Sequence, residues 1–186
     1  MNTLKKHSSE RLSYYNLTAE DIDLIFLLHS YPEVTRYNTL GIPKDIHVNK
    51  RALSQKLNPS DLTHLGWTIH NSVNQFIGEV GLVLAPTRFN KAEISYSLLP
   101  SFWNNGYATE VVTHFIRYVF NDLQLHRLEA GVAINNKASI RVLEKCGLKK
   151  EGHHRKILPL AEGWSDSFSY AILKQDIENN EIEHRL

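Results

Sequence analysis

The spacing of apolar residues along the chain predicts four helices and about seven strands. The strongest pattern covers 105–123, where apolar positions recur at helical spacing and form one continuous face. Weaker helical patterns cover 18–31, 46–57 and 137–145, and Pro32, Pro59 and Gly147 stand just beyond their ends. Short runs typical of strands occupy 11–17, 65–70, 76–84, 92–99, 128–134, 148–151 and 168–173.

The order of these elements indicates the fold class. A strand and two helices come first, a meander of three strands follows, and strands then alternate with helices. That order predicts an α/β (α+β) domain with a mixed central sheet and helices on its faces. We expect one domain over 10–175, a flexible tail over 1–9 and a loose charged tail over 176–186.

Composition narrows the function classes. The 186 residues include 21 Lys and Arg against 20 Asp and Glu, a formal net charge of +1. Proteins that grip nucleic-acid backbones usually carry a basic excess, so no nucleic-acid partner is expected. Cys146 is the only cysteine, which excludes an intrachain disulfide and fits a reducing compartment. The polar first ten residues lack the apolar segment of a signal peptide, and the apolar run 22–28 is too short to cross a bilayer. We therefore expect a soluble, cytoplasmic protein without a membrane partner.

The turn before the long helix is a candidate phosphate site. Its sequence is Trp103-Asn-Asn-Gly106-Tyr-Ala108-Thr-Glu. The first amides of a helix lack partners within the helix and carry the positive end of its dipole, and Gly106 and Ala108 leave room for a ligand to approach. The alternative is a glycine-containing helix start that binds no ligand.

A second segment, 135–148, follows the next predicted strand directly. Asn136 is a plausible N-cap, and Ser139 lies three residues later. Both side chains could point towards the open ends of the strands. Capping alone is the alternative reading.

Together the two segments resemble the GNAT superfamily of acyl-CoA-dependent N-acetyltransferases, and within it the RimJ/RimL-type branch. The similarity is carried by 93–96, 102–110, 126–130 and 136–147. It implies a sheet that splays between the fourth and fifth strands, here 92–99 and 127–134. It also implies acetyl-CoA as co-substrate. Many family members have Arg or Gln three residues before the glycine, where this chain has Trp103.

The resemblance also assigns CoA contacts. The pantetheine arm would pair with the backbone of Ser97, Leu98 and Leu99 and would touch Asn136, with Ser139 near the thioester sulfur. The pyrophosphate would lie on the amides of Asn104, Asn105, Gly106, Tyr107, Ala108 and Thr109.

Acetyl transfer to an amine needs a neutral amine, a donor to the carbonyl oxygen and a proton for the leaving thiolate. The resemblance implies a carboxylate in the central strands as the base, which makes Glu93 and Glu129 the candidates. The alternative for each is an ordinary strand charge, for Glu129 a salt bridge with Arg127 or a lysine. Ser139 matches the position of the acid in the ribosomal-protein branch. Tyr96 and Tyr107 are other possible acids. We interpret Cys146 as a structural residue because the C-terminal end of a helix raises a thiol pKa.

In the family that this chain resembles, the loop after the first helix forms a wall of the substrate site, which makes two loops here candidates for the substrate walls. Tyr31, Arg36, Tyr37 and Asn38 follow the first predicted helix, and Trp164 lies in the loop 159–166. The alternative is that these are ordinary surface loops. The ten histidines are scattered, and the neighbours His153 and His154 would point to opposite faces of a strand, so no metal is expected.

The leading hypothesis is a single-domain enzyme that transfers an acetyl group from acetyl-CoA by direct attack in a ternary complex. The acceptor would be the N-terminal α-amine of a protein, with a ribosomal protein as one option, or a small-molecule amine. A homodimer is compatible with this hypothesis. The alternative is a non-catalytic acyl-CoA-binding sensor or scaffold on the same fold.

Overall fold

A computed structural model describes residues 7–58 and 62–178. Its centre is one eight-stranded sheet with the order β1-β2-β3-β4-β5-β6-β8-β7. The strands are β1 (His7–Ser8), β2 (Leu12–Asn16), β3 (His64–Asn71), β4 (Phe76–Leu84), β5 (Lys91–Leu98), β6 (Arg127–Ala133), β7 (Lys149–Leu160) and β8 (Gly163–Leu173). The α-helices are α1 (Ile22–His29), α2 (Pro32–Thr35), α3 (Ile46–Ala52), α4 (Tyr107–Arg117), α5 (Lys137–Lys145) and α6 (Lys174–Glu178). The expected mixed α/β domain is confirmed.

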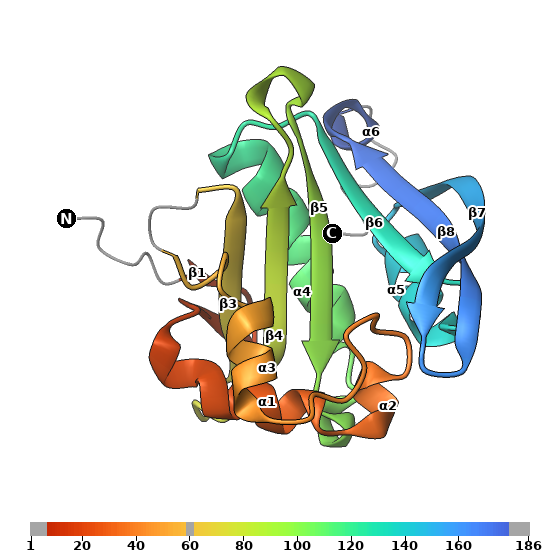
Figure 1. Cartoon of the computed structure of the whole chain (residues 1–186). Coiled ribbons are helices and arrows are strands. Elements are labelled where there is room, and N and C mark those ends of the chain that lie inside the picture. Colours follow the sequence, from red (N-terminus) through yellow and green to blue (C-terminus); the bar gives the residue numbers. More distant parts are fainter. Residues whose placement is uncertain (1–6, 59–61, 179–186) are drawn as a thin grey trace.

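Helices cover both faces of the sheet (Figure 1). On one face α4 supplies the largest apolar surface, and Val111, Val112, Phe115 and Ile116 are fully buried there. This is the continuous face that the spacing of apolar residues predicts. On the other face α1 and α3 contact each other, and Ile25 of α1 belongs to a smaller apolar cluster. The sheet therefore packs against an apolar cluster on each face.

The sheet opens in its middle. β5 and β6 are parallel neighbours, but they pair only where 91–93 meets 127–129, and beyond these positions the strands diverge (Figure 1). All the other neighbouring strands are antiparallel. The expected splay between 92–99 and 127–134 is therefore confirmed, and it leaves a V-shaped opening between the ends of β5 and β6.

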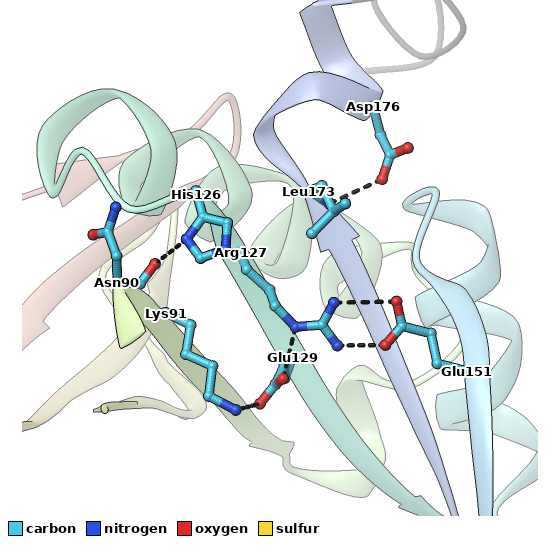
Figure 2. A network of polar contacts seen from close by, with 8 residues as sticks. All are labelled: Asn90, Lys91, His126, Arg127, Glu129, Glu151, Leu173 and Asp176. Carbon is cyan, nitrogen blue, oxygen red and sulfur yellow. Dashed lines mark hydrogen bonds and ion pairs between the residues drawn. The ribbon is translucent and has the colours of Figure 1, made fainter. Parts of the chain in front are cut away.

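A network of ion pairs fixes the closed end of this opening (Figure 2). Glu129 Oε2 lies 2.7 Å from Lys91 Nζ of β5, and Glu129 Oε1 lies 2.7 Å from Arg127 Nε on β6 itself. Both terminal nitrogens of the Arg127 guanidinium bind Glu151 of β7. Arg127 therefore links the carboxylates of Glu129 on β6 and Glu151 on β7. Glu129 also binds Lys91, so the network includes β5.

Some expected boundaries differ from the structure. The strand β1 and Ser9, which donates to Glu110 Oε1 at 2.7 Å, lie within the expected tail 1–9, and α6 lies partly within the expected tail 176–186. The rest of both tails, 1–6 and 179–186, is outside the described residues. The short helices α2 and α6 and the two-residue strand β1 show no periodicity because they are too short to repeat a pattern. Strand β7 continues to Leu160 instead of ending near 151, and most of its side chains are exposed on both faces, so it lacks an alternating pattern.

The long helix also differs in detail. Its α-helical part begins at Tyr107, two residues after the expected start, and its last turn, Tyr118–Asp122, is π-helical. None of the helices within 7–58 and 62–178 is both long enough and apolar enough to cross a membrane.

Candidate active site

The turn that leads into α4 has the backbone shape of an anion site. Gly106 is the N-cap of α4 with a left-handed backbone (φ 78°), and Asn104 also has a positive φ of 62°. The Glu110 amide donates the first helical hydrogen bond to the Gly106 carbonyl, at 3.1 Å. The amides of Tyr107, Ala108 and Thr109 precede that bond, and a glycine N-cap has no side chain to accept from them. Three donors at the positive end of the helix dipole are thus left for a ligand.

Trp103 attaches this turn to the end of β5. Its indole Nε1 donates to the Leu98 carbonyl oxygen at 2.8 Å. The Asn105 side-chain amide donates back to the Trp103 carbonyl oxygen at 2.9 Å. The aromatic residue that departs from the pattern of many family members therefore has a structural partner. It also occupies one of the backbone groups predicted to pair with the pantetheine arm.

A cavity of about 380 Å³ lies between the turn, the end of β5 and the start of α5. It brings together most of the predicted CoA contacts: Ser97, Leu98, Asn104, Gly106, Tyr107, Ala108, Thr109, Asn136 and Ser139. Leu99 and Asn105 do not line it. The Leu99 amide donates to the Ile77 carbonyl oxygen of β4 at 2.9 Å, so this amide is not free for a ligand.

Two hydroxyl groups meet inside the cavity. Tyr96 Oη lies 2.9 Å from Ser139 Oγ. Ser139 is held at the start of α5 because its amide donates to the Oδ1 of the N-cap Asn136 at 3.2 Å. Burial raises the pKa of Tyr96 to about 12, although the hydrogen bond to Ser139 opposes that rise. Tyr96 therefore stays protonated at neutral pH and can donate a hydrogen bond.

The two carboxylates predicted as bases lie at the closed end of the V and do not line this cavity. Burial raises the pKa of Glu129, but hydrogen bonds from Lys91 and Arg127 outweigh it and hold the pKa below its usual range. A catalytic base works best with a pKa near the working pH, so these contacts disfavour Glu129. Glu93 pairs in register with Glu129, and its Oε1 would lie 3.5 Å from a Cβ added to Gly131 of β6.

The cavity is also lined by three charged residues that the sequence analysis did not select as site residues. Glu33 of α2 is the one carboxylate among the lining residues of the described chain, and Arg141 and Lys145 of α5 are the cations. Arg141 and Lys145 are four residues apart, so they lie on one side of α5. That spacing, beside a predicted N-cap at Asn136, was the signal available in the sequence. The two exposed cations place positive charge beside the amides of the phosphate turn.

Cys146 lies beneath this site and not in it. Its side chain is fully buried, and its Sγ lies 3.7 Å from Thr113 Oγ1 and 3.5 Å from the Thr109 carbonyl oxygen. Burial raises the pKa of the thiol despite the hydrogen bond to Thr113. The thiolate that a nucleophile requires is therefore disfavoured. The geometry agrees with a packing role that supports α4 and α5.

Tyr37 lines both this cavity and a second one of about 410 Å³. Its hydroxyl donates to the Asn135 carbonyl oxygen at 3.1 Å, next to the N-cap of α5. Arg36 and Trp164, both predicted for the substrate walls, line the second cavity. The loop expected over 159–166 is instead a tight hairpin, in which Trp164 lies on β8 and pairs with Pro159 of β7. Tyr31 and Asn38 line neither, and Asn38 Oδ1 instead accepts from the Leu40 amide at 2.8 Å. Over the described ranges, no three His, Cys, Asp or Glu side chains gather as metal ligands would.

Comparison with known proteins identifies the family. The sequence model of the acetyltransferase (GNAT) domain matches residues 11–149. A relative from Bacillus subtilis (strain 168), an uncharacterized N-acetyltransferase called YoaA, is 32% identical over 171 residues, which is 89% of this chain and 95% of that protein. The chain therefore belongs to the GNAT acetyltransferase family. It is an N-acetyltransferase that takes its acetyl group from acetyl-CoA.

Solved structures agree on the fold. An acetyltransferase of the GNAT family from Bacillus anthracis superposes with a TM-score of 0.79 at 24% identity, covering 92% of this chain and 99% of that one. A spermidine N-acetyltransferase from Vibrio cholerae, in complex with CoA and spermine, superposes with a TM-score of 0.81 at 20% identity, covering 90% and 98%.

Proposed function

We propose that this chain transfers the acetyl group of acetyl-CoA to a primary amine by direct attack, with the donor in the 380 Å³ cavity and the acceptor entering past Tyr37. The observation that carries the proposal is the shared position of Tyr37, between the cavity of the phosphate turn and the cavity beside Trp164. The two-cavity arrangement suits a ternary complex, in which both substrates are bound before the reaction.

The phosphate turn would hold the pyrophosphate, with Arg141 and Lys145 adding charge on the α5 side. The open edge of β5 at Ser97 and Leu98 would face the pantetheine arm, because β6 has already diverged there. The pair of Tyr96 and Ser139 would act at the reacting end. One hydroxyl donates to the other, so a single proton remains available to the leaving sulfur.

The proton balance of the reaction is simple. The amine nitrogen forms the new C–N bond and releases one proton, the C–S bond breaks, and the thiolate takes up one proton. An α-amine has a pKa of about 7.7–8.0, so roughly a tenth of it is neutral at pH 7 and no strong base is needed for such an acceptor. An alkylamine, with a pKa of about 10.4 like that of lysine, is far less deprotonated and gains more from a base. Glu93 could accept the released proton only through water, because four residues of strand separate it from Ser97 by about 13 Å. Glu93 as a relayed base remains our proposal, and Glu129 is disfavoured by its ion pairs.

Three classes of acceptor follow. A protein N-terminus fits the predicted RimJ/RimL-like branch, a small-molecule monoamine fits the size of the second cavity, and a polyamine is suggested by the spermidine enzyme of Vibrio cholerae. The branch, a cytoplasmic location and a homodimer remain predictions.

Thiol release from acetyl-CoA, measured against a panel of primary amines and short peptides, tests this function. Amine-dependent release, with the N-acetyl product seen by mass spectrometry, is the expected result. If acetyl-CoA binds but none of the amines is acetylated, the non-catalytic sensor or scaffold is the better description.

A further inference from the structure

The second cavity has the means to select the acceptor. It lies where the loop after α2 meets the β7–β8 hairpin, and Tyr37 lines both it and the cavity of the phosphate turn. Its volume of about 410 Å³ is within the range of small-molecule sites. The charged and apolar side chains that line the second cavity determine which amine can bind there.

The charges in this cavity compensate one another. Its lining includes two acidic residues, Glu162 and Asp166, and two basic ones, Arg36 and Lys156. Arg36 Nη2 lies 3.7 Å from Glu162 Oε1. The described lining therefore offers no excess of negative charge.

Of the two carboxylates, Glu162 and Asp166, Asp166 makes the shorter contacts with neighbouring residues. Its Oδ2 lies 2.7 Å from His153 Nε2, and its Oδ1 accepts from the Lys156 amide at 2.9 Å. Lys156 Nζ in turn donates to the Trp164 carbonyl oxygen at 3.2 Å. Both oxygens of Asp166 thus have partners within the hairpin, and an incoming ammonium group would have to compete with them.

The neighbouring cavity adds positive charge. Arg141 and Lys145 line the donor side, against the single carboxylate of Glu33. A polyamine carries several positive charges at neutral pH, and binding it requires carboxylates that are not already paired. In the ternary complex the pyrophosphate would neutralise Arg141 and Lys145, so it is the second cavity, with two acidic and two basic residues, that gives a polycation no net attraction.

An aromatic and apolar surface is what remains available. Trp164 is 62% exposed at the cavity. Tyr37 uses its hydroxyl for Asn135, and the Arg36 guanidinium lies over its ring at 5.7 Å, so the rest of that ring is the part left for contact. Ile134 and Leu160 add partly buried apolar side chains to the same lining. An exposed indole gains most from a flat apolar partner and can also face one ammonium group.

We propose that the acceptor is a small monoamine whose single amine is attached to an aromatic or apolar body, held against Trp164 and Tyr37, and that polyamines are poor substrates. The inference rests on the proposed acetyl transfer and adds the acceptor's chemical class. The body occupies the second cavity, and the amine passes Tyr37 towards the pair of Tyr96 and Ser139.

The test compares 2-phenylethylamine with spermidine as acceptors, by thiol release at saturating acetyl-CoA. We expect kcat/KM for 2-phenylethylamine to be at least about tenfold higher, the difference of roughly 1.4 kcal/mol that one well-placed contact supplies. A preference for spermidine, or for peptides over both amines, would overturn the inference while leaving acetyl transfer intact. A panel in which no amine or peptide reacts would overturn the proposed function and this inference with it.

Single-residue variants test whether the second cavity causes the preference for the aromatic amine. Trp164→Ala should raise KM for 2-phenylethylamine by about fivefold, within the worth of a stacking contact, and leave KM for acetyl-CoA unchanged. Phe89→Ala is the matched control, since Phe89 is 47% exposed and lies between β4 and β5, outside both cavities.

Arg36→Ala removes the ion pair with Glu162 and leaves that carboxylate available to an ammonium group. The variant should raise kcat/KM for spermidine about threefold, which corresponds to the free energy of one exposed ion pair. Unchanged KM in Trp164→Ala would contradict the assigned cavity.

Discussion

The guanidinium of Arg11 binds the carboxylate of Glu110, 99 residues away, with 2.7 Å between Nε and Oε2. Arg11 lies just before β2, and Glu110 lies in the first turn of α4, beside the amides of the phosphate turn. The same guanidinium donates to the Asn105 carbonyl oxygen at 3.1 Å and stacks on the Tyr107 ring at 4.6 Å. The start of the chain's second strand therefore braces the turn from outside.

This brace has an electrostatic role that predicts a mutational pattern. Without Arg11, the Glu110 carboxylate would face the bound phosphates uncompensated. Arg11→Gln should therefore weaken CoA binding about fivefold, the worth of one charge at a helix N-terminus. The double variant Arg11→Gln with Glu110→Gln should recover to within about twofold, because the repulsion is gone as well. Calorimetric titration with CoA measures both.

Arg88→Gln serves as the control, because Arg88 also stacks on an aromatic ring, that of Phe89 at 4.7 Å, but lies far from the turn. Equal losses in the single and double variants would mean that Arg11 acts only by supporting the fold. A thermal melt of each variant reveals such a loss directly.

Gly106 provides a second prediction. Alanine there must adopt the left-handed backbone at φ 78°, which costs about 1–2 kcal/mol. If the turn relaxes to avoid that strain, the phosphate amides move, and CoA binding should fall by roughly tenfold. Gly41→Ala is a matched control, since Gly41 has φ 65° and open space around its Cβ position. Both variants should lose similar stability, and only Gly106→Ala should lose affinity for CoA.

The hydroxyl pair makes a prediction about chemistry. Tyr96→Phe should lower kcat by about 100-fold, the lower range for a general acid, and leave acetyl-CoA affinity within about twofold. Tyr15→Phe, which removes a hydroxyl bound to Asn74 on the far side of the sheet, should leave kcat unchanged. Because the pKa of Tyr96 is about 12, the wild-type rate should rise with pH as the amine loses its proton, without a descending limb at moderately alkaline pH. A limb near pH 7 would point to a different acid.

A buried pair beneath α1 gives a stability prediction. Glu79 Oε1 of β4 lies 2.7 Å from His29 Nε2, and Asn49 Nδ2 of α3 lies 3.4 Å from the other ring nitrogen of His29. Burial raises the pKa of Glu79, but the His29 hydrogen bond and the charge of Lys56 outweigh it, so the folded-state pKa lies below its usual range. The stabilisation is therefore present above the unfolded-state pKa and is lost as pH falls through the folded-state pKa.

Glu79→Gln imitates the protonated carboxyl, so it should destabilise the fold at pH 7 by about 1.5–3 kcal/mol, the worth of a hydrogen bond to a charged group. The difference from wild type should shrink towards pH 3. Urea unfolding at both pH values measures it, with the exposed Glu20→Gln as the control. A difference that does not depend on pH would contradict the assignment of an ionised Glu79.

Sequence reasoning succeeds at this site where the features are local. The turn around Gly106 and the cap formed by Asn136 and Ser139 can be read from consecutive residues, because backbone angles and helix capping depend on near neighbours. The long face of α4 can be read for the same reason. Short, exposed or irregular elements such as β1, α2 and the outer part of β7 have no repeating pattern to detect.

Pairs formed across the fold are the part that could not be predicted. The contacts of Arg11 with Glu110 and of His29 with Glu79 join residues 99 and 50 positions apart, and no spacing rule relates them. Glu129 is a partial exception, because a salt bridge with Arg127 or a lysine is the alternative that the sequence offers for it, and the structure has both pairs. Its place on a central strand favours a catalytic role, whereas its neighbours Lys91 and Arg127 neutralise it once the sheet has formed.

The splay of β5 from β6 also changes how many edges the sheet has. An ordinary open sheet has two edges, and here they are the two-residue strand β1 and the charged strand β7, both poor templates for another strand. The divergence beyond Glu93 and Glu129 creates two more edges in the interior of the same sheet. Backbone donors and acceptors that would invite aggregation at an outer edge thus face the opening between β5 and β6, the side on which an extended ligand would pair with them.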